Sequence, residues 1–328
     1  MHRRTRQALI ALPLILAIGA LVAFAGSAGG VRWQGVPVFA GCVALAFALN
    51  VLAFVPAWLA QTEKYYDLTG SLTYLTVLAA ALLGSAAARE AAHGGASEAA
   101  RAATGASADT GLEARSLLLA ALVAIWAVRL GLFLFRRIRE DGRDPRFDAI
   151  KPDFARFLMA FVLQGLWVSL TAAAALAALT SARIPPLGMT DAVALAVFAL
   201  GFGLEVVADR QKRAFRKNPA NRDRFIATGL WARSRHPNYL GEILLWTGIA
   251  GLAWPALAGA QLFTLVSPLF VFVLLTRISG IPLLEARAEQ RWGDDPAYRA
   301  YLARTPRLGL RLRPRDGAPA PDPSGTAR

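Results

Sequence analysis

The hydrophobic residues of this chain gather in eight blocks of roughly 18–25 residues, the length that crosses the ~30 Å hydrocarbon core of a bilayer. No water is available in that core, so each block must satisfy its backbone polar groups internally, which favours helices. The blocks cover approximately residues 8–25, 37–60, 68–88, 116–135, 155–180, 188–207, 239–258 and 260–277. The sequence therefore predicts an all-α, polytopic transmembrane bundle of about eight helices.

The distribution of positive charge predicts the orientation of this bundle. If all eight segments cross and the N-terminus is cytoplasmic, 29 of the 36 Lys and Arg residues fall on the cytoplasmic side and 5 on the other. This asymmetry follows the positive-inside rule, and it explains the net charge of +14 without a nucleic-acid partner. We therefore expect an N-in/C-in integral protein of the inner (plasma) membrane, surrounded by membrane lipids.

Composition also predicts how the chain is divided. Residues 1–308 are expected to form a single integral membrane domain, interrupted by a flexible outward loop at 89–111 that is rich in Ala, Gly and Ser. The end of this domain is expected to be a short amphipathic cytoplasmic segment, followed by a disordered basic Pro/Gly-rich tail at 309–328. The first hydrophobic block follows three arginines, so a cleaved signal peptide and a retained anchor are both open, with the anchor favoured.

Metal chemistry is not expected. The chain has one cysteine, Cys42, inside a hydrophobic block, and three histidines, His2, His93 and His236. This set offers neither a disulfide framework nor the His/Cys spacing of a metal site.

Residues that can carry chemistry are densest between 205 and 242. Asp209, Lys212 and Arg216 share one helix face, because they are three and four positions apart. Asn218-Pro219 is expected to end that helix, and Pro237 is positioned to begin the next one.

The start of that next helix is a candidate anion site. Its unpaired amide groups, together with Arg235, suit a phosphate. Glu242 is expected about one turn inside the membrane, where an unpaired carboxylate is costly, so it is a candidate site residue. The alternative interpretation of the whole stretch is a basic collar at the membrane interface.

These residues resemble a known family. The run SRHPNYLGE at 234–242, preceded by GLW and by ADRQK..F, is similar to the bacterial DUF1295 family, which is related to the C-terminal region of steroid 5-alpha-reductases and to the sterol reductases. TEKYYDLTGSLTYL (62–75) and EARAEQRWGDDPAYRAYLARTP (285–306) resemble two further family segments, so the likeness extends over most of 60–306, outside the 89–111 loop.

The resemblance implies NADPH bound on the cytoplasmic side and hydride delivered to an activated carbon–carbon double bond of a steroid-like or other lipid substrate. No GxGxxG fingerprint follows a strand, so a Rossmann site is not expected. The residues that match the family's cofactor-binding positions are Asp209, Lys212, Arg216, Arg235, His236, Asn238, Tyr239, Tyr298 and Tyr301.

The sequence identifies catalytic residues less clearly than cofactor-binding residues. Reduction of an enone needs a donor that polarises the carbonyl, and Glu63, Tyr74 and Glu242 are the candidates for this role. For the residues of the 63–74 region, an interfacial aromatic belt with a surface ion pair is an equally good interpretation.

Two other functions remain open. Membrane methyltransferases of the isoprenylcysteine carboxyl-methyltransferase type share the helical plan and an RHPxYxG motif, but bind S-adenosylmethionine. Asn238, Glu242 and the ADRQK..F helix favour the reductase. The third possibility is a non-enzymatic membrane protein, although the paired repeats of a transporter are not evident.

Overall fold

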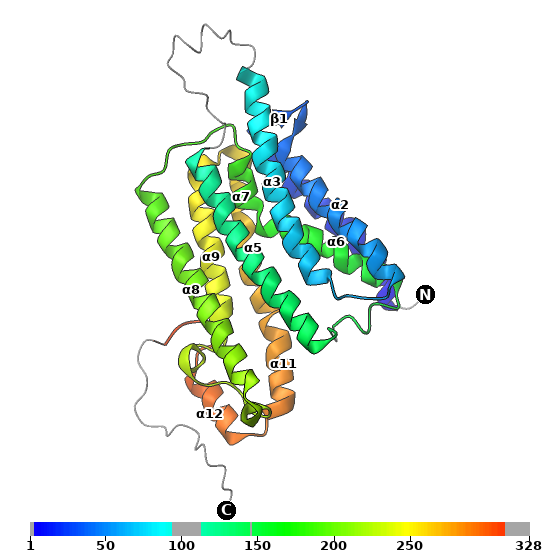
Figure 1. The fold of residues 1–328 in the computed structure, drawn as a ribbon, viewed down its shortest axis with the longest axis vertical. Coiled ribbons are helices and arrows are strands. Elements are labelled where there is room, and N and C mark those ends of the chain that lie inside the picture. Colours follow the sequence, from blue (N-terminus) through cyan, green and yellow to red (C-terminus); the bar gives the residue numbers. More distant parts are fainter. Residues whose placement is uncertain (1–2, 94–112, 145, 312–328) are drawn as a thin grey trace, which may run out of the picture. The chain divides into compact units, whose positions relative to one another are not determined.

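The computed structural model describes residues 3–93, 113–144 and 146–311, and these residues form an all-α bundle, as predicted (Figure 1). The only regular strands in these residues are two short antiparallel ones, β1 (Arg32–Trp33) and β2 (Val36–Pro37). The α-helices are α1 (Arg3–Ser27), α2 (Val38–Leu59), α3 (Tyr66–His93), α5 (Ala114–Asp141), α6 (Phe154–Thr171), α7 (Ala173–Leu179), α8 (Met189–Lys217), α9 (Pro237–Ala253), α10 (Val266–Val273), α11 (Ile281–Trp292) and α12 (Pro296–Arg304).

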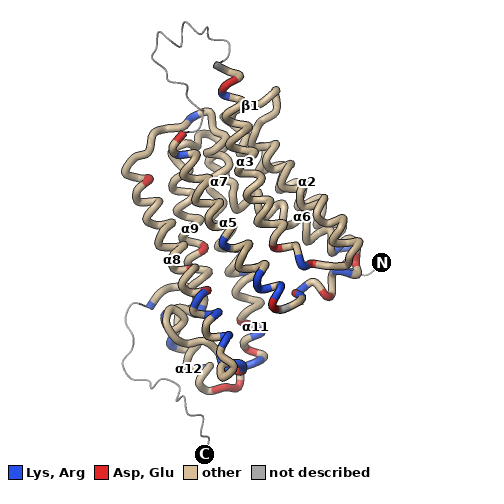
Figure 2. Tube along the Cα trace, viewed as in Figure 1, with Lys and Arg blue, Asp and Glu red and all other residues tan. Residues whose placement is uncertain are grey.

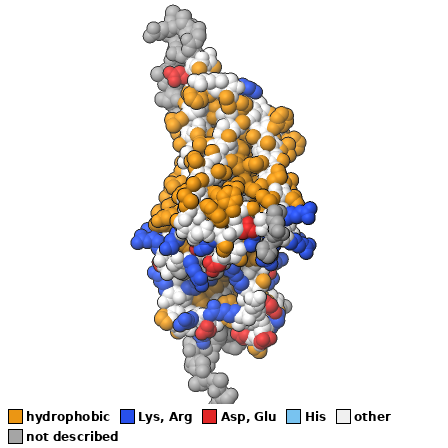
Figure 3. Space-filling model, turned by 90° about the vertical axis from the view of Figure 1, so that its right-hand side faces the viewer, with side chains coloured by type: hydrophobic (Ala, Val, Ile, Leu, Met, Phe, Trp, Pro, Cys, Tyr) orange, Lys and Arg blue, Asp and Glu red, His pale blue; other side chains and the backbone are white. Residues whose placement is uncertain are grey.

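Seven helical runs within the described residues are long and apolar enough to cross a membrane. They are Arg3–Ser27, Val38–Leu59, Tyr66–Ala92, Ala114–Glu140, Phe154–Thr171, Met189–Lys217 and Gly259–Trp292. The remaining predicted segment, 239–258, folds as α9, which has 17 residues and continues into a 3₁₀ turn at Trp254–Ala256. Figure 3 shows a broad surface of hydrophobic side chains on the face turned to the viewer. The chain is therefore an integral membrane protein, while its orientation and the identity of its membrane stay predictions.

The predicted loop and tail lie mostly outside the described residues. Residues 89–93 complete α3, whereas the remainder of the 89–111 loop is outside the described part of the chain. Of the 309–328 tail, only residues 309–311 are described.

The chain divides into two compact units. The first comprises Met1–Leu195 and Thr247–Phe270, and the second comprises Ala196–Trp246 and Val271–Arg328. The dividing positions fall inside α8, α9 and α10. This division does not test whether residues 1–308 form a single membrane domain, so that assignment stays a prediction.

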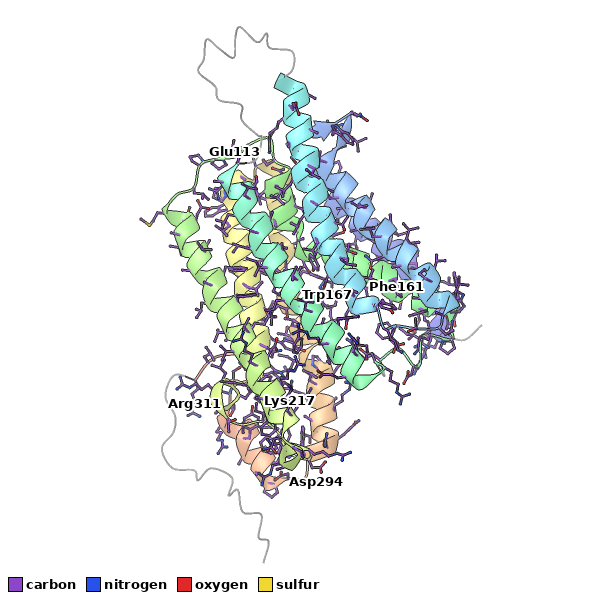
Figure 4. The ribbon with its side chains drawn as sticks, viewed as in Figure 1. Glu113, Phe161, Trp167, Lys217, Asp294 and Arg311 are labelled. Carbon is purple, nitrogen blue, oxygen red and sulfur yellow. The ribbon has the colours of Figure 1, made fainter. Side chains whose placement is uncertain are left out.

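The first unit is packed around aromatic rings and small residues. Phe54, Phe147, Phe157 and Phe161 form a buried cluster, and the Phe157 and Phe161 centroids lie 5.4 Å apart in an edge-to-face arrangement. Figure 4 labels Phe161 of this cluster. Every residue of α7 is buried, because its alanine-rich sequence allows neighbouring backbone to approach closely.

A buried ion pair also holds the first unit together. The Arg115 guanidinium forms a bidentate pair with the Asp191 carboxylate, and the two residues are 3% and 4% exposed. Arg115 also donates to the carbonyls of Pro185, Pro186 and Leu252. The Gly188 amide donates to Asp191, so both partners of this pair are satisfied.

The second unit depends on a close helix contact. A Cβ at Gly201 of α8 would lie 2.6 Å from the Gly241 carbonyl oxygen of α9, so only glycine permits this approach. Beyond this contact α8 continues to Lys217, and Asn218 caps the 3₁₀ turn that follows, which confirms the predicted helix end. The C-terminal amphipathic segment folds as α11 and α12.

Candidate functional site

A cavity of about 640 Å³ lies entirely within the second unit. Its walls are the end of α8, the segment 218–236, α11 and α12. The tube view shows Lys and Arg concentrated around these elements (Figure 2). The eight cationic residues of the lining are Lys212, Arg216, Lys217, Arg222, Arg224, Arg235, Arg287 and Arg291, and Glu285 is the one acidic residue there. The cavity is therefore strongly electropositive.

Six aromatic residues share the lining with these cations. They are Phe215, Phe225, Trp231, Trp292, Tyr298 and Tyr301. The combination of flat apolar faces and positive charge suits a ligand that carries both aromatic rings and phosphates.

The α8 wall is positioned by Trp231. The Lys212 ammonium lies 4.6 Å from the Trp231 ring centroid, close enough for a cation–π interaction. The buried Trp231 indole donates to the Ala208 carbonyl at 3.1 Å, which fixes the ring against α8. The chain then leaves α8 at Lys217, which also lines this cavity. Figure 4 labels Lys217 at the end of this helix.

The segment that follows α8 is fastened to α11 and α12. The Trp292 indole donates to the Asp223 carbonyl at 2.7 Å, and the Arg291 guanidinium pairs with the Asp223 carboxylate at 2.8 Å. The Phe225 ring packs against Tyr298 and Tyr301, with centroids 5.1 and 5.4 Å away. These contacts bring residues that are about 70 positions apart in sequence into one cavity wall.

Glu285, the acidic residue of the lining, organises several of the basic groups around it. Its carboxylate lies 3.0 Å from Arg235 Nη1, 3.3 Å from His236 Nε2 and 2.9 Å from Arg307 Nη2. The backbone supports this arrangement, because the Arg235 amide donates to the Pro306 carbonyl at 2.9 Å. One carboxylate therefore orients several basic groups without neutralising the cavity.

His236 is held as a neutral imidazole. Burial is the main cause that lowers the pKa of His236 to about 4; the nearby Lys212 and Arg235 charges act in the same direction, and Glu285 acts in the opposite direction. Since this pKa lies below the ordinary value of 6.5, folding favours the neutral form.

We therefore expect an acid-sensitive contribution of His236 to stability. This contribution is complete above pH 6.5 and is lost as the pH falls toward 4, by about 3 kcal/mol at ~1.4 kcal/mol per pH unit. Unfolding of the detergent-solubilised protein between pH 7 and pH 4 measures it, with His236→Gln as the non-titrating comparison. Equal losses in both proteins would show that the imidazole charges without cost in the folded state.

The two tyrosines of α12 are buried hydrogen-bonding groups. The Tyr301 hydroxyl donates to the Trp231 carbonyl at 2.8 Å. Burial raises the pKa of both Tyr298 and Tyr301 above the ordinary value, so both hydroxyls keep their protons at neutral pH.

Six of the nine predicted cofactor-binding residues line this cavity: Lys212, Arg216, Arg235, His236, Tyr298 and Tyr301. The other three are described residues outside the lining. Tyr239 stacks on the His236 ring, with centroids 5.8 Å apart, and so supports a lining residue. Asp209 lies one turn before Lys212 on α8, and Asn238 is the second residue of α9.

The predicted catalytic residues are distributed over both units. Glu63 and Tyr74 belong to the first unit, and Glu242 belongs to the second, on α9. Tyr74 is buried, and its ring meets Trp126 edge-to-face at 5.2 Å. Glu242 is half-buried in the second turn of α9.

Glu63 has a well-defined set of partners. Its carboxylate lies 2.6 Å from the Lys151 ammonium and accepts the Asp144 amide at 2.9 Å. Burial alone would raise the pKa of Glu63, but these partners outweigh it and hold the pKa below its ordinary value. The ionised carboxylate thus fastens the 142–153 loop, and these contacts favour an anchoring role for Glu63.

Several residues of the cavity are not predicted from the sequence. They are Glu285, Arg287, Arg291 and Trp292 of α11, and Arg222, Arg224 and Phe225 of the 218–228 segment. One feature of the sequence could have indicated the α11 wall of the cavity. Leu284, Ala288 and Arg291 are four and three positions apart, so they lie on one helix face. Within the described residues, no group of three or more His, Cys, Asp and Glu could hold a metal ion.

The fold and this cavity define a polytopic helical membrane protein with a cationic, aromatic-lined binding site. Residues 82–305 match the family described as "Protein of unknown function (DUF1295)". The chain belongs to that family. The match includes all nine predicted cofactor-binding residues and Glu242, but neither Glu63 nor Tyr74.

A relative occurs in Schizosaccharomyces pombe, where it is an uncharacterised protein. It is 27% identical over 228 residues, which cover 60% of this chain and 64% of the relative. The chain thus matches somewhat less than two thirds of that protein's length. No solved structure matches the chain.

Proposed function

We propose that this protein is a membrane-embedded, NADPH-dependent reductase that saturates an activated carbon–carbon double bond in a steroid-like or other lipid substrate. The observation that carries the proposal is the cavity of the second unit, where eight cationic and six aromatic residues surround about 640 Å³ with one carboxylate among them. A volume of this size lies within the ~300–1,000 Å³ typical of small-molecule and cofactor sites.

The charge of the cavity favours a dinucleotide phosphate over other cofactors. NADPH carries a pyrophosphate and a ribose 2′-phosphate together with an adenine ring and a flat dihydronicotinamide ring, so it can use both the cations and the ring faces. S-adenosylmethionine has a single carboxylate and bears positive charge on its sulfonium and amine, which a strongly cationic lining repels.

Particular residues have distinct roles in this proposal. Arg235 and Lys212 bind phosphate oxygens, and Glu285 holds Arg235 and the neutral His236 in place. Tyr298 and Tyr301 contribute ring faces from α12. Bound in this cavity, NADPH would supply the hydride for the β-carbon of the activated double bond.

The substrate also requires a proton donor. Tyr74 and Glu242 stay the sequence-based candidates for this role, whereas the pairing of the Glu63 carboxylate with Lys151 favours an anchoring role for Glu63. The cations of the cavity belong to segments that the positive-inside rule assigns to the cytoplasm, where NADPH is available.

Ligand-induced stabilisation tests the proposal. A ligand at a hundred times its dissociation constant raises the free energy of unfolding by ~2.7 kcal/mol. We expect the purified protein in detergent to be stabilised by NADPH and to oxidise NADPH when a lipid enone is added. Stabilisation by S-adenosylmethionine alone would instead identify a methyltransferase, and no response to either ligand would favour a non-enzymatic protein.

A further inference from the structure

A second cavity, of about 360 Å³, lies in the first unit, outside the site described above. It is formed where α3 begins and α5 ends, and its lining residues are Lys64, Tyr65, Phe135, Ile138, Arg139 and Gly142. Two of these residues are cationic and none is acidic, so the cavity favours an anion. The other side chains present aromatic and aliphatic surface.

The local backbone explains why this space exists. Gly142 ends α5 in the left-handed conformation, with φ of 76°, and its amide donates to the Ile138 carbonyl at 2.9 Å. A Cβ at Gly142 would meet no atom within 4 Å, so the chain turns away and leaves open space beside the helix end.

The two cations remain available for a ligand. Among the described side chains, neither Lys64 nor Arg139 forms an ion pair, and the Arg139 guanidinium lies 5.9 Å from the Phe135 ring centroid. Acidic residues of the neighbouring loop are engaged by other cations: Glu63 by Lys151, Asp144 by Arg146 and Asp148 by Arg143.

The position of the cavity identifies the kind of anion. The membrane-length runs Tyr66–Ala92 and Ala114–Glu140 begin and end at this cavity, so it lies at the depth of lipid headgroups. Tyr65 is 61% exposed, as is typical of an aromatic residue at the membrane interface. Lys64, before α3, and Arg139, in the last turn of α5, both lie at positions that the positive-inside rule assigns to the cytoplasmic side, where the leaflet is anionic.

We propose that this cavity is a binding site for the phosphodiester headgroup of an anionic phospholipid. Lys64 and Arg139 bind the phosphate oxygens, while Tyr65, Phe135 and Ile138 contact the glycerol and the first part of the acyl chains. This site is independent of the proposed NADPH cavity, because all its lining residues belong to the first unit.

Native mass spectrometry and thermal unfolding of the detergent-solubilised protein test this inference. The probes are phosphatidylglycerol, phosphatidylcholine with the same acyl chains, and glycerol phosphate, which has no acyl chain. We expect phosphatidylglycerol to bind and stabilise the protein more than the other two. Replacing both cations, in Lys64→Gln/Arg139→Gln, is expected to weaken phosphatidylglycerol binding by about tenfold or more.

The matched control is Arg4→Gln/Arg136→Gln, which removes the same charge from exposed residues outside the cavity lining. It should keep the preference for phosphatidylglycerol. Equal weakening in both double variants would show that only net charge matters and would overturn the site. Full stabilisation by glycerol phosphate would also overturn it, because the site would then bind a small free anion. The NADPH response should be unchanged in the Lys64→Gln/Arg139→Gln protein, which separates this test from that of the proposed function.

Discussion

Replacing Arg235 by alanine is expected to lower the affinity for NADPH by about 100-fold, equivalent to ~3 kcal/mol. Arg235 lines the cavity and is oriented by Glu285 at 3.0 Å, so its guanidinium is already held in position when a phosphate binds. Charge-assisted bonds of this kind, made in a partly desolvated site, are among the strongest polar contacts. Titration of NADPH against the purified variant measures the loss.

The fold of the Arg235→Ala variant should survive, because Glu285 keeps His236 and Arg307 as partners. Its free energy of unfolding without ligand is therefore expected to stay close to that of the wild type. Arg304→Ala is the matched control, since Arg304 is exposed, lies outside the cavity lining and carries the same charge. If both variants bound NADPH as the wild type does, Arg235 would not be a phosphate ligand.

Arg115→Ala is expected to reduce the free energy of unfolding by about 3–5 kcal/mol. The substitution leaves the Asp191 carboxylate buried with only the Gly188 amide from the original set of partners, and it also removes the donor to three carbonyl groups. Such a buried, unpaired charge is far more costly than the loss of an exposed pair. Denaturation in a defined detergent measures the difference.

An exposed pair on α11 and α12 provides the control for this prediction. Arg299 and Glu289 form an ion pair in which both side chains are about half exposed, so Arg299→Ala should cost no more than ~1 kcal/mol. In the double variant Arg115→Ala/Asp191→Ala, the loss should be smaller than the sum of the single losses, because no unpaired charge remains. Strictly additive losses would show that the two residues act independently.

The membrane helices could be predicted because their physical requirement is local. A block such as 37–60 must be apolar over the full width of the bilayer, and the structure places α2 at Val38–Leu59. Two helix boundaries were also predicted, because proline marks them: α8 ends before Asn218-Pro219, and α9 begins at Pro237. The boundaries between the two units lie inside α8, α9 and α10, and they could not be predicted in this way. The hydrophobicity of the sequence does not change at these boundaries.

The candidate site was only partly predictable, for a different reason. Lys212, Arg235 and His236 occur in a compact run that resembles a family motif, and all three line the cavity. Arg291 and Trp292 reach it only because α11 packs against the segment after α8, a contact between residues nearly 70 positions apart. A single sequence contains no record of such long-range pairing. Arg291 therefore looked like one more cation of an amphipathic helix.

Glu63 shows how a motif position can have a structural role. In the sequence, Glu63 lies close to Tyr65 and Tyr66, and a carboxyl group among tyrosines suits a proton donor. The structure adds Lys151 at 2.6 Å and the Asp144 amide, partners that lie 88 and 81 positions away. Spacing along the chain could not distinguish these two roles, because the deciding contacts come from a distant loop.

The central claim, that the cavity of the second unit receives a nucleotide phosphate, is tested most directly by determining the structure of the protein with saturating NADPH. We predict density for the pyrophosphate within hydrogen-bonding distance of Lys212 and Arg235, with a heterocycle against the Trp231, Tyr298 and Tyr301 side of the cavity. An empty cavity in a sample shown to contain bound NADPH, with the nucleotide located elsewhere, would contradict the account.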